Sequence, residues 1–279
     1  MKKIILIFGV ISIFSGCNSS DPSKENSRSE TPVKLKSTLS DSALNSIIET
    51  IPSPLELASL IQNTGASFTE SFLNNTDNIS KYNSQFSKAL NLGIYGADLG
   101  YVNLYEKTFS SIDYLNTVYQ LATDLNIGDF FDFNTLKRLA TNNKNLDSIV
   151  YITTMGFEKM QNQLKKTHDS QISVLILIGG WIEGIYLTTG IVQNTNTPES
   201  KDLMITVYDE HIVLDDLVKL VNAYKDNPNF DNLASDLTNL KKVCDDVVIE
   251  KSRTDKPISQ EQFNKIAKEV KIIRNKLIE

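Results

Sequence analysis

The chain has 279 residues, with 28 basic and 34 acidic side chains, a formal net charge of −6 and two cysteines. Nucleic acid is not an expected partner, because phosphate binding needs a basic surface that this charge balance does not supply. Two cysteines provide no disulfide framework, so stability must come from a hydrophobic core, and the chain is long enough to form one.

The first predicted element is a signal peptide at residues 1–16. Two lysines are followed by an apolar stretch over residues 4–14 and by two small residues before Cys17, which is the order found in secretory signals. A membrane-spanning helix needs about 20 apolar residues, so this run is too short to span a bilayer. The segment Phe14-Ser15-Gly16-Cys17 resembles the lipobox of bacterial lipoproteins, although Phe14 stands where Leu is usual. The alternative is an ordinary cleaved signal with an incidental cysteine.

Cleavage before Cys17 and acylation of its sulfur, with chains such as palmitate, predict a membrane as the first partner. One acyl chain holds a protein at a membrane only weakly, whereas two or more hold it stably. The expected location is therefore the cell envelope, as an outer-membrane lipoprotein facing the periplasm or the cell surface. Loss of Lys2 and Lys3 with the signal lowers the net charge from −6 to −8.

Residues 17–40 are predicted to form a lipidated, flexible tether. They are polar, contain two prolines and lack aromatic side chains, so they offer too little burial to offset the entropy lost on ordering. A helical domain is expected to follow at residues 41–279.

The first predicted helix of this domain, at residues 51–65, has sequence signals at both of its ends. Ser53 can cap it, Pro54 suits the first helical position, Glu56 completes a capping box and Gly65 can end it. Apolar periodicity predicts further helices at 84–107, 109–126, 134–143, 145–167, 171–193, 199–226, 230–251 and 260–278.

These elements predict an all-α fold, a single bundle of roughly eight to ten helices. Ser259 and Gln262 form a second capping box before the last helix, and the strand signals of alternating apolar residues around tight turns are missing. Short connections favour antiparallel neighbours. A division into two domains at the polar loop near residue 195 is the alternative.

Two segments with glycines four residues apart, LNLGIYGADLGYVNLY and LILIGGWIEGIYLTTG, predict a close helix crossing. The ladders are Gly96 to Gly100 and Gly180 to Gly184. Glycine inside a helix costs up to about 1 kcal/mol relative to alanine, so its repeated use at helical spacing indicates a packing requirement.

Each glycine segment also contains one acid followed three residues later by a tyrosine, Asp98 with Tyr101 and Glu183 with Tyr186. Positions three apart share a helix face, so each acid is expected to meet its tyrosine or the acid of the other segment. The likeness of the two segments indicates either a weak internal duplication or a coincidence.

Glu183 is the only charged residue between Ile172 and Val192, a stretch long enough to span a bilayer. A carboxylate in mid-membrane is costly, so the central helix of a soluble bundle is the preferred interpretation. Glu183 would then be buried and would need partners or a proton.

Two roles remain open for the acids. One is structural, a hydrogen bond that fixes helix register, and it is favoured because buried networks perturb acids without any function. The other is a ligand pocket with perturbed acids among aromatic side chains. The candidate ligand-binding residues are Tyr95, Asp98, Tyr101, Trp181, Glu183 and Tyr186.

The sequence indicates no catalytic motif, no metal site and no cofactor. His168 and His211 are the only histidines and lack a metal-binding context. His211 and Asp215 lie one turn apart, but the acids around them indicate a solvated face. Cys244 shares a helical face with Leu240, which indicates core packing rather than reactivity.

Three stretches, IPSPLELASLIQ, KALNLGIYGADLGYVNLY and GGWIEGIY, resemble an uncharacterised family of lipoproteins from Bacteroidetes-type Gram-negative bacteria. The resemblance covers most of the chain after Cys17 and implies an all-helical, lipid-anchored envelope protein without an assigned activity. The expected function is a binding or scaffolding module with a protein or small-molecule partner. The alternative is an envelope hydrolase or lyase that uses Asp98 and Glu183.

Overall fold

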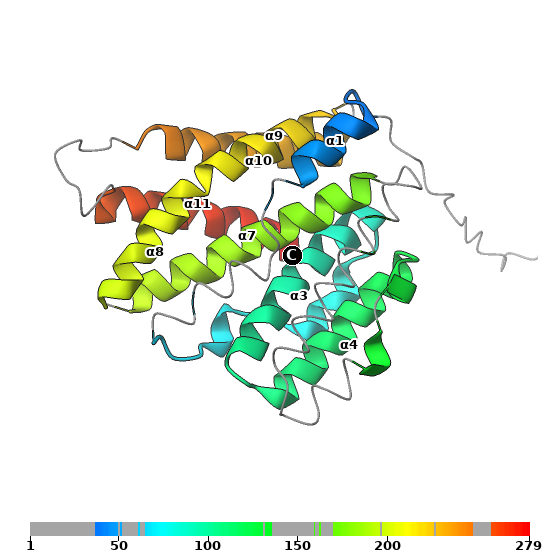
Figure 1. The fold of residues 1–279 in the computed structure, drawn as a ribbon, viewed down its shortest axis with the longest axis horizontal. Helices are drawn as coiled ribbons and strands as arrows, with labels where there is room; N and C mark the ends of the chain where they lie inside the picture. The colour runs from blue at the N-terminus through cyan, green and yellow to red at the C-terminus, as the bar shows by residue number, and fades with distance from the viewer. Residues whose placement is uncertain are drawn as a thin grey trace, which may run out of the picture. The chain divides into compact units, whose positions relative to one another are not determined.

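The computed structural model is helical throughout the part of the chain that it describes (Figure 1). That part comprises residues 37–49, 51, 61, 65–130, 132–135, 159, 162, 170–195, 197–225, 227–247 and 258–279. It contains eight α-helices, three short 3-10 helices and no strand. The predicted all-α fold of about eight to ten helices is confirmed.

Helix α7 (Ser170–Asn194) forms the centre of the bundle and is buried over most of its length. It packs against α3 (Gln85–Leu104), α11 (Gln260–Ile278), α8 (Pro198–Asp209) and α1 (Asp41–Ile48). Among the described helices α7 alone is long and apolar enough to cross a membrane, and 94% of its most apolar window is buried inside the bundle. This burial accounts for its composition, as expected of a core helix.

The most extensive helix packing in the described part is between α3 and α7, and it depends on two glycines. A Cβ atom on Gly93 would overlap the carbonyl oxygen of Ile176 and lie 2.6 Å from the nitrogen of Gly180. A Cβ atom on Gly179 would overlap the carbonyl oxygen of Leu90. The two backbones therefore touch without an intervening side chain. The predicted close crossing is present, but Gly96 was wrongly included, because a Cβ there would meet nothing within 4 Å.

Helices α3 and α4 (Thr108–Asp124) end two or three residues earlier than the periodicity predicts. The chain turns out of each helix at a residue with positive φ, 53° at Glu106 and 60° at Asn126. The next residue in each case donates its N–H to the carbonyl five residues earlier, at 3.2 and 2.8 Å. This is the Schellman arrangement, and it usually has glycine where these two residues stand.

The predicted single helix at 199–226 was wrong, because α8 ends at Asp209 and α9 (His211–Asn222) follows at once. Thr197 caps α8, and Pro198 occupies its first turn. The intervening residue, Glu210, accepts a hydrogen bond from Nε1 of Trp181 in α7 at 2.9 Å. This tertiary contact lies at the junction of the two helices.

Two further helices lie close to their predicted positions. Helix α10 (Pro228–Asp245) begins two residues earlier than predicted, because Asn227 caps it and proline suits its first turn. The predicted end at residue 251 was wrong, because α10 ends at Asp245. Helix α11 has the predicted bounds, and the Ser259–Gln262 capping box that opens it is present.

Helix α1 was not predicted, although Ser40 caps it and two of its own residues, Leu44 and Ile48, are buried. Just before α1, in the last part of the predicted tether, the N–H of Thr38 donates to the carbonyl of Ala223 at 2.7 Å. The chain is thus already fixed to the bundle at this point.

Several predicted elements lie wholly or mostly outside the described residues. They are the signal at 1–16, Cys17, most of the tether at 17–40 and the helices at 51–65, 134–143 and 145–167. Gly65, the predicted end of the helix at 51–65, has φ of 66°, the left-handed conformation found after helix ends.

Candidate functional site

The two candidate acids meet inside the bundle. Asp98 from α3 and Glu183 from α7 are both 0% exposed, and they lie close enough for the Glu183 carboxylate to raise the pKa of Asp98. Their meeting follows from the glycine contacts, because Gly93 and Gly179 bring the backbones of α3 and α7 together. Of the two expected arrangements, acid to acid is therefore present.

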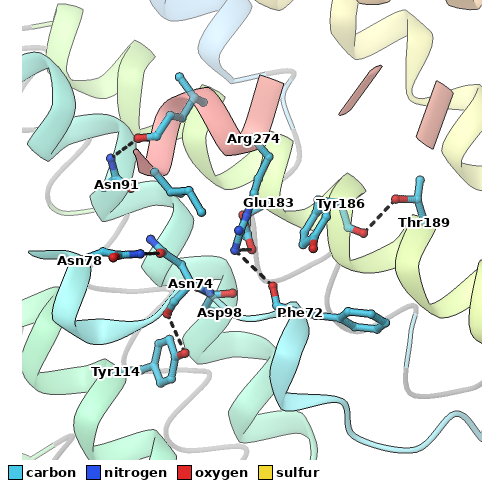
Figure 2. Close-up of polar contacts among 12 residues, drawn as sticks. Phe72, Asn74, Asn78, Asn91, Asp98, Tyr114, Glu183, Tyr186, Thr189 and Arg274 are labelled. Atoms are coloured by element: carbon cyan, nitrogen blue, oxygen red, sulfur yellow. Dashed lines mark hydrogen bonds and ion pairs between the residues drawn. The ribbon is translucent and has the colours of Figure 1, made fainter. Parts of the chain in front are cut away.

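Arg274 from α11 completes what we call the buried cluster, formed by Asp98, Glu183 and Arg274 (Figure 2). Its Nε donates to Oε2 of Glu183 at 3.0 Å and its Nη2 to Oε1 at 3.1 Å, a bidentate ion pair. The Arg274 side chain is 5–6% exposed, and the ring of Tyr186 lies 4.7 Å from its guanidinium carbon. The ion pair and the cation–π contact thus join α7 to α11.

The buried cluster has two carboxyl groups and one guanidinium group, so it needs one proton to be neutral. Burial, followed by the adjacent Glu183 carboxylate, raises the pKa of Asp98 well above its usual range. Burial also raises the pKa of Glu183, but the Arg274 guanidinium opposes that rise. We therefore assign the proton to Asp98, which donates it to Glu183.

The other oxygen contacts of Asp98 support this assignment. Its Oδ2 accepts the backbone N–H of Asn74 at 3.1 Å. Its Oδ1 is buried and accepts no hydrogen bond. A buried carboxyl oxygen without a donor favours the neutral form of the group over the carboxylate.

Asn74 belongs to a segment without α-helix, residues 66–82, which we call the strap. It contains two short 3-10 helices, Glu70–Phe72 and Thr76–Lys81, and the carbonyl of Phe72 accepts Nη2 of Arg274 at 3.2 Å. The strap therefore contacts the buried cluster twice, at Asp98 and at Arg274 (Figure 2).

Tyrosine hydroxyls fix the backbone of the strap along its length. The bonds are Tyr105 to the carbonyl of Ala66 at 2.8 Å, Tyr114 to Asn74 at 2.8 Å, Tyr95 to Asn75 at 2.7 Å, and the N–H of Thr69 to Tyr101 at 3.1 Å. Backbone groups of a non-helical segment must find partners when they are buried. The tyrosines of α3 and α4 supply these partners.

The structure brings together only part of the predicted pocket. Asp98, Glu183 and Tyr186 meet around Arg274, and Tyr95 contacts the strap nearby. The spacing predicts that Tyr101 can pair with Asp98, but Tyr101 stacks on Phe68, and its hydroxyl accepts the N–H of Thr69. Trp181 binds Glu210 at the junction of α8 and α9 instead.

Three residues of the site, Arg274, Asn74 and Tyr114, are not among those predicted from the sequence. A signal for Arg274 was present, because it lies on the apolar face of α11 with Phe263, Ala267 and Val270, where a lone charge indicates a buried partner. Asn74 carries no comparable signal, since its contribution to the buried cluster is a backbone N–H.

The other residues considered for chemistry have ordinary surroundings. Nδ1 of His211 lies 2.6 Å from the carbonyl oxygen of Tyr208, and the described residues contain no group of three metal-binding side chains. Cys244 is buried, as predicted, and burial raises the pKa of its thiol to about 12.

Comparison of the chain with protein-family models, with curated proteins and with solved structures finds no match.

Proposed function

We propose that this chain is a lipid-anchored binding or scaffolding module of the cell envelope, held at a membrane by acyl chains on Cys17. The order of lysines, apolar residues and small residues before Cys17 supports the anchor. The burial of α7 also supports the anchor. Among the described helices α7 is the one long and apolar enough to span a membrane, and other helices already cover it.

The closed state of the buried cluster is the observation that favours binding over catalysis. A catalytic acid must come within hydrogen-bond distance of its substrate, yet Asp98 and Glu183 are 0% exposed and covered by three helices and the strap. The ion pair between Glu183 and Arg274 joins α7 to α11, and Asp98 from α3 lies beside Glu183. We therefore assign the cluster an architectural role, which leaves the helix surfaces for a partner.

The anchor is tested by metabolic labelling of cells with an alkyne-tagged fatty acid, followed by mass spectrometry of the amino-terminal peptide. We expect a chain that starts at Cys17 and carries acyl groups, and we expect the Cys17→Ala variant to lack the label. An uncut or unmodified wild-type terminus would contradict the proposal.

The binding role is tested by photo-crosslinking in cells. A photoreactive residue is placed at the exposed apolar positions Tyr119, Ile212 and Ile272, which are 49, 64 and 39% exposed, and at the exposed polar position Lys268 as a control. A discrete adduct from one face, lost in the Cys17→Ala background, is expected. Purified chain that cleaves envelope glycans, and loses that activity in Glu183→Gln, would instead support the hydrolase alternative.

A further inference from the structure

The buried cluster is enclosed by elements of two kinds. Three sides are helices, α3, α7 and α11, whose backbones are bonded internally and of which α3 and α7 touch at Gly93 and Gly179. The remaining cover is the strap, which Figure 2 shows running past Asp98 from Phe72 to Asn78. It is held to the helices by single hydrogen bonds to its backbone and by the partly buried side chains of Phe68, Phe72, Leu73 and Ile79, which pack against the core.

The charge of the cluster depends on one proton. With Asp98 neutral, the negative charge of Glu183 and the positive charge of Arg274 cancel. Without the proton, two fully buried carboxylates lie near one guanidinium, and the cluster has a net charge of −1. Such a pair repels strongly in a medium of low polarity and needs water.

The strap is the element that can admit this water with the least disruption. Opening α3 from α7 would separate the largest helix interface in the described part. Lifting the strap breaks the hydrogen bonds described above but leaves that interface closed, and most strap residues are already half-buried or exposed, with Ala66, Asn74 and Tyr82 as the buried exceptions. Segments with few buried apolar contacts are the ones that open first.

We propose that the strap is a proton-dependent cover: it stays closed while Asp98 and Glu183 share one proton, and loss of that proton opens it and hydrates the cluster. This inference rests on the described residues alone and does not depend on the lipid anchor.

The ionisable groups that face the cluster from the elements packed around it are tyrosines: Tyr82 from the strap, Tyr95 from α3, Tyr114 from α4 and Tyr186 from α7. Glu70 of the strap acts on Tyr114. Burial raises the pKa of each of these tyrosines, so their hydroxyls stay neutral. The shared proton is therefore the one that the cluster can lose.

The test is amide hydrogen exchange of the full chain, measured by mass spectrometry at several pH values and corrected for the intrinsic pH dependence of exchange. In the wild type, the opening constant of strap peptides should rise by up to tenfold per pH unit, because opening releases one proton. In Asp98→Asn, whose amide can still accept from Asn74 and donate to Glu183, the opening constant should not depend on pH. Peptides from α10 serve as an internal control and should behave alike in both proteins.

A second variant separates the proton from the strap's own bonds. Tyr114→Phe removes the hydrogen bond to the carbonyl of Asn74, so it should raise strap opening by a constant factor and leave the pH dependence unchanged. Equal pH dependence in wild type and Asp98→Asn, or none in the wild type, would overturn the proposal.

A direct measurement holds even if Asp98→Asn fails to fold. Infrared spectra of wild-type chain with isotope-labelled aspartate should show the C=O stretch of one protonated carboxyl group at every pH at which the strap is closed, and this band should disappear as the strap opens. Absence of the band while exchange shows the strap closed would also overturn the proposal.

Discussion

Replacing Gly93 with alanine tests the contact on which the meeting of the acids depends. A methyl group at this position would overlap the carbonyl oxygen of Ile176 and lie 2.6 Å from the backbone nitrogen of Gly180. Backbone atoms of a helix cannot turn aside as a flexible side chain can. We therefore expect α3 and α7 to move apart and the bonds between Asp98, Glu183 and Arg274 to lengthen.

The size of the effect follows from two opposing contributions. Alanine is a better helix former than glycine by about 1 kcal/mol, whereas overpacking a core costs about 1–3 kcal/mol and sometimes more. Because the clash is with backbone at the largest helix interface of the described residues, we expect a cost at the upper end of that range and a net loss of about 2 kcal/mol in the free energy of unfolding. For a chain of this size, that corresponds to a fall in Tm of roughly 4–8 °C.

Gly96→Ala is the matched control, three residues away on the same helix. A Cβ there meets nothing within 4 Å, so only the helix propensity applies and stability should rise by about 0.5–1 kcal/mol. The measurement is urea unfolding followed by circular dichroism, with thermal unfolding as a check. If Gly93→Ala proved as stable as Gly96→Ala, the close crossing of α3 and α7 would be refuted.

Three further predictions concern titratable or charged side chains. The folded chain holds the Asp98 proton more tightly than the unfolded chain does, because its pKa is raised on folding. The stabilising effect of this proton is therefore complete below the ordinary carboxyl pKa and is lost as pH rises through the folded pKa. In urea titrations, the stability of the wild type relative to Asp98→Asn should fall by up to about 1.4 kcal/mol per pH unit, and a difference that does not change with pH would contradict the shared proton. Arg274→Met leaves a buried carboxylate without its cation and should cost about 3–5 kcal/mol, a loss that Arg274→Met with Glu183→Leu should largely recover in a double-mutant cycle. The thiol of Cys244, with a pKa of about 12, should resist alkylation at neutral pH until urea unfolds the chain, and rapid labelling of the native protein would show that α10 is not packed as described.

Local patterns were sufficient to place most of the described helices. The Ser259–Gln262 capping box and the apolar stripe that follows gave α11 its correct bounds. Apolar periodicity gave the start of α8 within one residue, and Thr197 and Pro198 provide its cap and first turn. These signals work because the side chains that satisfy a helix start lie within a few residues of it in sequence.

Helix ends and interruptions were less predictable where they depend on distant residues or on uncommon conformations. Glu106 takes a left-handed conformation that usually indicates glycine, so nothing in the letters showed that α3 ends at Leu104. The junction at Glu210 depends on a hydrogen bond from Trp181, which is 29 positions away.

In the candidate site, too, the residues with local signals were predicted and those that depend on distant partners were not. Spacing and isolation among apolar residues identified Asp98 and Glu183, because an unpaired acid in a core helix must have a partner. The partner itself, Arg274, lies 91 positions from Glu183. The tyrosines were assigned to a pocket because aromatic residues often line one, but the structure engages Tyr95 and Tyr101 with the backbone of the strap.

The way in which the strap is recognised has a consequence for how the chain tolerates change. Four tyrosines form hydrogen bonds with its main chain, and every residue type except proline offers the same main-chain groups. Ser67, Ser71 and Asp77 are exposed or half-buried in the strap and should accept almost any replacement in a mutational library. Phenylalanine in place of Tyr95 or Tyr114 should be selected against, although it differs by a single oxygen atom.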